Sequence, residues 1–65
     1  MHNAMAPPSS IFTKYRDLQR MWRWRLVAKN GRIIADSGEG YHHEADCDHG
    51  IALVKASFNS PTSKG

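Results

Sequence analysis

The sequence contains a single cysteine, Cys47, so one chain can form neither an internal disulfide nor a metal site built from paired thiolates. No apolar run approaches the roughly 20 residues that are needed to cross a bilayer. Residues 1–6 lack the basic segment followed by an apolar one that marks a secretion signal. These absences predict a cytoplasmic protein without disulfides and without a membrane partner.

Signals of catalysis are also missing from the sequence. It shows no Ser, His and Asp spacing typical of a hydrolase and no glycine-rich phosphate loop. Gly38-Glu39-Gly40 is an isolated pair of glycines, which gives the backbone freedom before Tyr41. A domain this small leaves little room for a pocket of about 300 Å³, the approximate lower limit for ligand sites. We therefore predict no enzyme, no small-molecule substrate and no cofactor.

A cluster of histidines and acids is the one pattern that could bind a metal. It comprises His42, His43, Asp46, Cys47 and His49. On a helix, His43 and Cys47 would share a face, as two ligands of a zinc site do. Cys47, however, belongs to an apolar stripe and should point into the core, where a free cysteine behaves as a small hydrophobic residue. The sequence favours a solvated helix face over a metal site.

The length of 65 residues allows one domain, which buries only about 60 % of the surface of its unfolded chain. Domains of this size usually gain stability from disulfides, a metal or a partner subunit. Because the first two are not expected, a second copy of the chain is the predicted partner. Residues 1–9 and 59–65 are expected to be disordered, which leaves a single domain over 10–58.

The dipeptide Asn30-Gly31, between β-prone segments 21–29 and 32–37, predicts a hairpin with a two-residue type I′ turn. In that register opposed residue numbers sum to 61, so Arg25 should form an ion pair with Asp36. The same register pairs Val27 with Ile34 and Ala28 with Ile33. One face then becomes the apolar core face, formed by Trp22, Trp24, Leu26, Ala28, Ile33 and Ala35.

Two more elements complete the expected fold. Residues 10–16 are rich in β-branched and aromatic side chains and predict a first strand, joined to the hairpin by a turn at 17–20. Residues 43–56 change to a helical period. The apolar stripe of this helix should cover the core face and comprises Cys47, Gly50, Ile51, Val54 and Phe58.

Several short motifs occur together in a fixed order: Trp22-Arg23-Trp24-Arg25-Leu26, Asn30-Gly31, Gly40-Tyr41 and Gly50-Ile51. With them the chain resembles the YegP-like family of uncharacterised proteins, over about residues 12–56. The resemblance implies an α+β fold of order β-β-β-α, completed by a second copy in tandem or in a homodimer that exchanges C-terminal segments. It implies no known activity. The chain departs from the family at Lys14, commonly apolar, at Arg20, commonly Gly, and at His42 and His43, where Ser is usual.

Two interaction surfaces follow from the expected arrangement. Val27, Ile34 and Phe58 are predicted at a homodimer interface, because a monomer would leave them uncovered. The alternative is weak binding of nucleic acid by a basic sheet face formed by Arg23, Arg25, Lys29 and Arg32. Against it, the two tryptophans alternate onto the core face and leave only Tyr15 as an outward aromatic residue.

Overall fold

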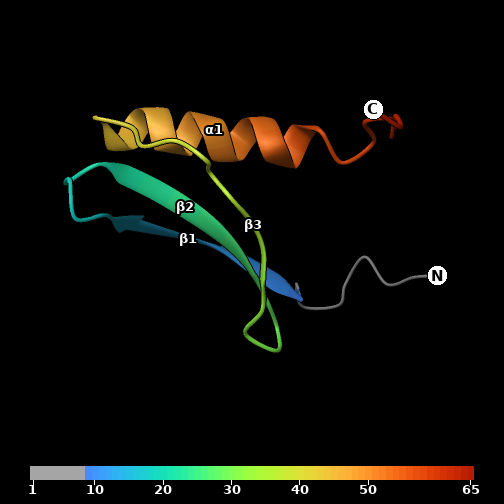
Figure 1. The fold of residues 1–65 in the computed structure, drawn as a ribbon, viewed down its shortest axis with the longest axis horizontal. Helices are drawn as coiled ribbons and strands as arrows, with labels where there is room; N and C mark the ends of the chain where they lie inside the picture. The colour runs from blue at the N-terminus through green and yellow to red at the C-terminus, as the bar shows by residue number, and fades with distance from the viewer. Residues whose placement is uncertain (1–8) are drawn as a thin grey trace.

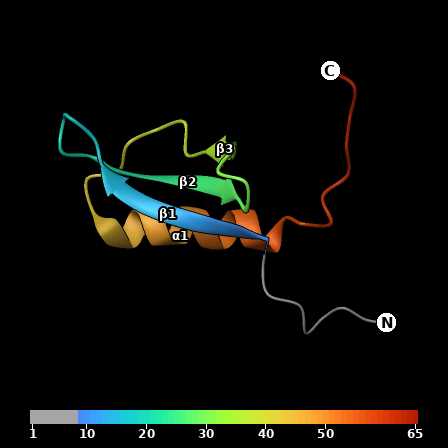
Figure 2. The ribbon, with the colours of Figure 1, turned by 90° about the horizontal axis from the view of Figure 1, so that it is seen from below.

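The structure is a computed structural model, which describes residues 9–65. It contains the strands β1 (Ser10–Arg16), β2 (Trp22–Ala28) and β3 (Ile33–Asp36), followed by the helix α1 (Glu44–Ala56). The strands form an antiparallel sheet of order β1-β2-β3, and α1 covers one face of it (Figures 1 and 2). The predicted β-β-β-α fold is confirmed. The leader predicted at 1–9 lies outside the described residues except for Ser9, and the domain limits 10–58 stay a prediction.

The loop between β1 and β2 is a three-residue hairpin loop. Its ends are closed by the N–H of Asp17, which donates to the Met21 carbonyl at 3.0 Å, and by the N–H of Arg20, which donates to the Asp17 carbonyl at 2.9 Å. Such a loop is a type I turn whose last residue adopts a left-handed conformation. Arg20 adopts it here, with φ of +65°.

The loop between β2 and β3 repeats this hydrogen-bond pattern. The N–H of Gly31 donates to the Ala28 carbonyl at 2.9 Å, and the N–H of Ala28 donates to the Arg32 carbonyl at 2.8 Å. Gly31 has φ of +89°, whereas Asn30 does not have a positive φ. The predicted type I′ turn is therefore wrong. Asn-Gly also suits the three-residue loop, because the Asn30 side chain accepts the N–H of Arg32 at 3.0 Å and glycine tolerates positive φ.

The register of the second hairpin shifts by one residue at a β-bulge. Arg25 lies opposite Asp36 and Leu26 opposite Ala35, as predicted, but Val27 lies opposite Ile33 because the register shifts between Leu26 and Val27. The predicted pairs Val27–Ile34 and Ala28–Ile33 are wrong. The loop has one residue more than the type I′ turn, and Ile34 is the extra residue that restores the register. Ile33 consequently lies on the face of Val27, not on the core face.

The core lies between the sheet and α1. Trp24, Cys47 and Ile51 are buried, and the half-buried apolar side chains packed against them are Phe12, Trp22, Leu26, Ala35, Tyr41 and Val54. Phe12 meets Trp24 edge to face, with ring centroids 5.5 Å apart. Cys47, Ile51 and Val54 occupy the predicted stripe. Phe58 does not, because it follows the last helical turn and is 83 % exposed.

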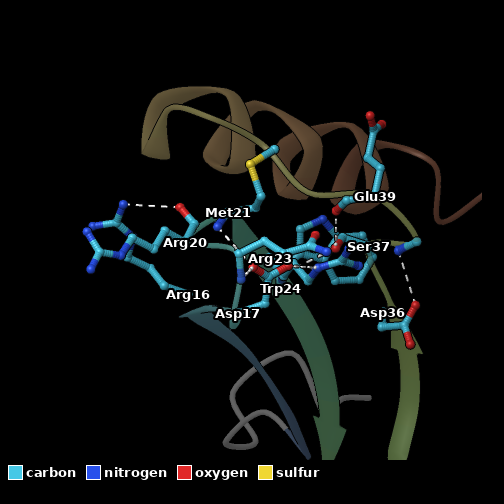
Figure 3. A network of polar contacts seen from close by, with 11 residues as sticks. Arg16, Asp17, Arg20, Met21, Arg23, Trp24, Asp36, Ser37 and Glu39 are labelled. Atoms are coloured by element: carbon cyan, nitrogen blue, oxygen red, sulfur yellow. Dashed lines mark hydrogen bonds and ion pairs between the residues drawn. The ribbon is translucent and has the colours of Figure 1, made fainter.

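The segment after β3 leaves β2 and then rejoins it. The N–H of Ser37 donates to the Trp24 carbonyl at 3.0 Å, and beyond Gly38-Glu39-Gly40 the backbones of Trp22 and Tyr41 exchange hydrogen bonds of 2.7 and 2.8 Å. Between these two attachments to β2, the Ser37 hydroxyl donates to the Glu39 carbonyl at 2.8 Å (Figure 3). This second attachment holds Tyr41, and with it the start of α1, against the middle strand.

The left-handed conformation of Arg20 predicts that Arg20→Gly stabilises the protein. A non-glycine residue in this conformation costs roughly 1–2 kcal/mol, and glycine removes this cost. Part of the gain in stability is offset because glycine loses more conformational entropy on folding. The hydrogen bond from the Arg16 guanidinium ends on the Arg20 carbonyl, so it survives the change. We expect the free energy of unfolding to rise by about 1 kcal/mol in urea titrations. Gly31→Ala, in the equivalent position of the other loop, should lower it by a similar amount, and equal stabilities of all three proteins would contradict the assignment.

Candidate functional site

The outer face of the sheet is the face that α1 leaves uncovered (Figure 1). The strand pairing places Tyr15 opposite Arg23, Thr13 opposite Arg25, and Ile11 opposite Val27. Since side chains alternate along a strand, these residues share one face with each other and with Ile33. The face is polar and basic near the β1–β2 loop and apolar at its other end.

Arg23 is part of a polar network that fixes the β1–β2 loop (Figure 3). Its Nε donates to Asp17 Oδ2 at 2.5 Å, and Asp17 Oδ1 accepts the N–H groups of Met21 and Gln19. These contacts lower the pKa of Asp17, with Arg23 as the largest cause, and Asp17 in turn raises the pKa of Arg23. Arg23 therefore stabilises the β1–β2 loop, and the Asp17 carboxylate neutralises its charge.

Arg25 lies over the ring of Tyr15, with its guanidinium carbon 4.3 Å from the ring centroid. The predicted ion pair between Arg25 and Asp36 is wrong, although their backbones are paired as expected. Asp36 instead accepts the N–H of Gly38 at 3.1 Å and shapes the turn after β3. The cation–π contact covers one side of Tyr15, which among the described strand residues is the only aromatic one on this face.

The four basic residues predicted to bind nucleic acid do not gather at one place. Arg23 and Arg25 lie on β2, whereas Lys29 and Arg32 are exposed in the β2–β3 loop. Six residues of extended chain between Arg23 and Lys29 correspond to roughly 20 Å. The alternative function stays a prediction, and no specific observation favours it.

The apolar end of the outer face holds one of the three predicted interface residues, Val27. Ile11 and Ile33 are 65 % and 57 % exposed and lie on either side of the half-buried Val27. Ile34 is 58 % exposed and borders a hollow with Ala28 and Asn30 instead. Phe58 lies elsewhere, beyond the C-cap Ser57 of the helix that covers the opposite face. The structure thus places Val27, Ile34 and Phe58 at three separate positions.

A lysine clamp joins β1 to the start of α1. Lys14 Nζ contacts Glu44 Oε2 at 2.6 Å and Asp48 Oδ1 at 2.7 Å, so both acids raise the pKa of Lys14, Asp48 most strongly. At the other end of the helix, Lys55 Nζ lies 5.7 Å from the ring centroid of Phe12. Sequence reasoning missed this clamp, although Glu44 and Asp48 are one helical turn apart and therefore share a face.

The histidine cluster borders an open groove of about 600 Å³ beside α1. His42, His43, Asp46 and His49 are exposed on its rim, while Cys47 is fully buried, and burial raises the pKa of its thiol. Within residues 9–65, no three His, Cys, Asp or Glu side chains come together as metal ligands would. In the same range, no helix is both long and apolar enough to cross a membrane.

The floor of this groove contains a close approach between the helix and the sheet. A Cβ atom at Gly50 would lie 2.7 Å from the Tyr41 hydroxyl and 3.5 Å from Trp24 Nε1. Trp24 Nε1 is buried and has no hydrogen-bond partner in the described part of the chain. The missing side chain of Gly50 therefore lets both aromatic residues approach α1.

A short antiparallel meander with one helix on one face, held by charged clamps at its edges, defines a small α+β module. Its sequence matches the domain of unknown function DUF1508 over residues 19–63. The chain belongs to this family of uncharacterised domains, and the YegP-like resemblance is confirmed.

Similar proteins occur in bacteria and archaea. A UPF0339 protein of Neisseria meningitidis serogroup B is 44 % identical over 45 residues, which cover 69 % of this chain and 79 % of that protein. A UPF0339 protein of Methanosarcina acetivorans is 44 % identical over 55 residues, covering 85 % and 90 %. The solution structure of a protein from Haloferax volcanii superposes with a TM-score of 0.81 at 36 % identity, over 91 % of this chain and 98 % of that one. The Haloferax volcanii protein shares the fold, and none of the three names states an activity.

Proposed function

We propose that the protein is a non-enzymatic module that self-associates as a two-fold homodimer. The observation that carries this proposal is the imbalance between a core of three buried residues and a surface rich in large apolar side chains. Among residues 9–65, the large apolar side chains that are exposed are Ile11, Leu18, Ile33, Ile34, Leu53 and Phe58. A second copy can cover several of them at once.

The surface area of the chain is sufficient for such a dimer. A core of this size rarely supplies more than about 3–5 kcal/mol. A stable interface of standard size buries about 800 Å² per partner, which is about a seventh of the 5591 Å² that the chain exposes. Apolar area removed from water contributes about 25 cal/mol per Å² before the costs of association. Of the sequence-based interface residues, Phe58 is the most exposed and offers the most side-chain surface to a partner.

Light scattering coupled to gel filtration tests this proposal. The wild-type chain of 7.3 kDa should elute with about twice that mass at micromolar concentration. Phe58→Asp should raise the dissociation constant of the dimer about tenfold or more, because it places a charge among groups that exclude water in the dimer. Since Phe58 is 83 % exposed, circular dichroism should show an intact fold.

Asn59→Asp is the matched control, because it adds the same charge one residue further along without removing an apolar side chain. It should leave the dissociation constant within a factor of about two. A wild-type chain that stays monomeric at 100 μM, on the order of typical weak dimer constants, and unfolds cooperatively would show that the small core suffices alone.

A further inference from the structure

An open hollow lies on the outer face of the sheet, beside the β1–β2 loop. Its volume is about 510 Å³, which exceeds the roughly 300 Å³ of the smallest ligand sites. Three of its lining residues are arginines and one is an acid, so it carries a formal excess of two positive charges. The arginines are Arg16, Arg23 and Arg25, and the acid is Asp17.

The charge of Arg25 has no acid to neutralise it. Within residues 9–65 its guanidinium forms neither an ion pair nor a side-chain hydrogen bond, because Asp36, its strand partner, accepts the N–H of Gly38. The guanidinium is held over the ring of Tyr15, with Cζ 4.3 Å from the ring centroid. A cation–π contact uses no N–H group as a hydrogen-bond donor, so the five N–H donors of Arg25 remain free for a ligand.

Arg23 adds free donors to the same hollow. Its contact with Asp17 Oδ2 is made by Nε, while Asp17 Oδ1 accepts two backbone N–H groups (Figure 3). The Nη groups of Arg23 therefore have no acceptor within the described residues. Arg23 and Arg25 share a face of β2 two residues apart, which places their Cα atoms about 7 Å from each other. One oxyanion between the two side chains can accept hydrogen bonds from both.

We propose that this hollow binds a phosphate monoester, with Arg25 as the main anion-binding residue and Arg23 as the second donor. Guanidinium groups bind phosphate through two parallel N–H···O bonds, and a terminal phosphate has three oxygens that can accept from both arginines. Its charge of nearly −2 at neutral pH matches the excess charge of the hollow. Because Tyr15 holds Arg25 and Asp17 holds Arg23, little side-chain freedom is lost on binding.

The arrangement of charges favours one terminal phosphate over a nucleic-acid backbone. A nucleic-acid strand needs cations along its path, but Lys29 and Arg32 lie beyond the other end of β2, and the outer face between is apolar at Val27. At the near end, Leu18 and Gln19 of the loop border the hollow. Leu18 is fully exposed there, so an apolar ring attached to the phosphate can pack against it.

Phenyl phosphate, which joins one terminal phosphate to an apolar ring, is the probe for this site. In NMR titrations of the isotope-labelled full chain, the backbone amide signals of Tyr15, Gln19 and Arg25 should shift and saturate. Arg25→Gln should raise the dissociation constant about tenfold, because charge-assisted hydrogen bonds to the phosphate are lost. Since Arg25 is exposed, circular dichroism should show an intact fold.

Arg32→Gln is the matched control, because it removes the same charge from an exposed arginine in the other loop. It should change the dissociation constant by less than about twofold, since distant surface charges are screened by salt. Equal losses of affinity in Arg25→Gln and Arg32→Gln would show attraction by net charge alone and would overturn the site. The absence of saturable shifts with phenyl phosphate would overturn it as well.

The charge of the ligand provides a second readout. Phenyl sulfate has the same shape with a single negative charge and should bind more weakly. A phosphate monoester loses its second charge with a pKa of about 6, so lowering the pH from about 7.5 to about 5 should weaken phenyl phosphate binding severalfold and leave phenyl sulfate binding unchanged. The arginines keep their charge in this range, the pKa of Asp17 is held below its usual value, and no histidine lines the hollow.

Two further ligands separate the possible sources of the phosphate. Inorganic phosphate lacks the ring and should bind more weakly than phenyl phosphate; equal binding would overturn the choice of an ester. A thymidine oligonucleotide without a terminal phosphate contains only diesters and should also bind more weakly. Tighter binding of this oligonucleotide than of phenyl phosphate would overturn the proposal in favour of a nucleic-acid surface.

Discussion

Trp24→Ala is expected to abolish cooperative folding. Trp24 is the largest of the three buried residues, is 5 % exposed, and touches both the helix and Phe12. Truncation of a buried tryptophan to alanine costs about 3–5 kcal/mol, which equals the whole stability that a core of this size supplies. Thermal melts followed by circular dichroism should lose their sigmoidal transition.

Two variants make this result interpretable. Trp24→Phe keeps most of the ring and removes the buried Nε1–H that has no partner, so it should retain a cooperative transition with a smaller loss. Leu18→Ala removes an exposed apolar residue and should change stability by about 0.5 kcal/mol or less. If Trp24→Ala melts cooperatively with a loss below about 1 kcal/mol, the buried trio is not the main source of stability.

Gly50→Ala is expected to destabilise the protein although alanine is the better helix former. Alanine gains about 1 kcal/mol in helix propensity, but its Cβ would lie 2.7 Å from the Tyr41 hydroxyl and must displace it. Overpacking of this kind costs about 1–3 kcal/mol, and Tyr41 cannot move freely because its backbone is bound to Trp22. We expect a net loss of about 1 kcal/mol in the free energy of unfolding by urea.

Tyr41→Phe provides the test of this mechanism. It removes the hydroxyl and leaves a 3.3 Å contact to the ring carbon Cζ. Gly50→Ala should therefore be tolerated better in the Tyr41→Phe protein than in the wild type, with a coupling of about 1 kcal/mol in the double-mutant cycle. Ala52→Gly, at an exposed position of the same helix, measures the propensity difference alone. Additive effects of Gly50→Ala and Tyr41→Phe would exclude the steric explanation.

The elements of the fold could be predicted because each depends on a local pattern. The first strand matches the prediction at both ends, 10–16, and the helix begins one residue later than predicted and ends at Ala56. Cys47 is buried as its place in the apolar stripe required. The register of the second hairpin was correct at Arg25 and Leu26, away from the turn.

The predictions that were wrong concern positions where two local structures have similar energies. Asn-Gly suits both a two-residue and a three-residue loop, and the choice decides whether Ile33 faces the core or the solvent. The ion pair expected from the register is absent, and Asp36 instead accepts the N–H of Gly38.

Prediction of the candidate site was less successful for a related reason. Side chains on the outer face interact with residues that their own strand pairing does not specify. Arg23 forms an ion pair with Asp17 in the turn, and Arg25 lies over the ring of Tyr15. Strand alternation shows which face a residue occupies and says nothing about these partners. The lysine clamp depends on where the helix lies over β1, which the separate patterns of strand and helix do not determine.

The two short hairpin loops have a consequence for the order of folding. Each joins neighbouring strands over three residues, so most of the sheet forms from contacts of low sequence separation. Docking of α1 closes much longer stretches, as in the contacts of Lys14 with Glu44 and Asp48, which lie 30 and 34 residues away. Because closing a longer loop costs more entropy, the helix should dock onto a hairpin that already exists. We therefore expect a transition state in which β1 and β2 are paired and the contacts of α1 form late.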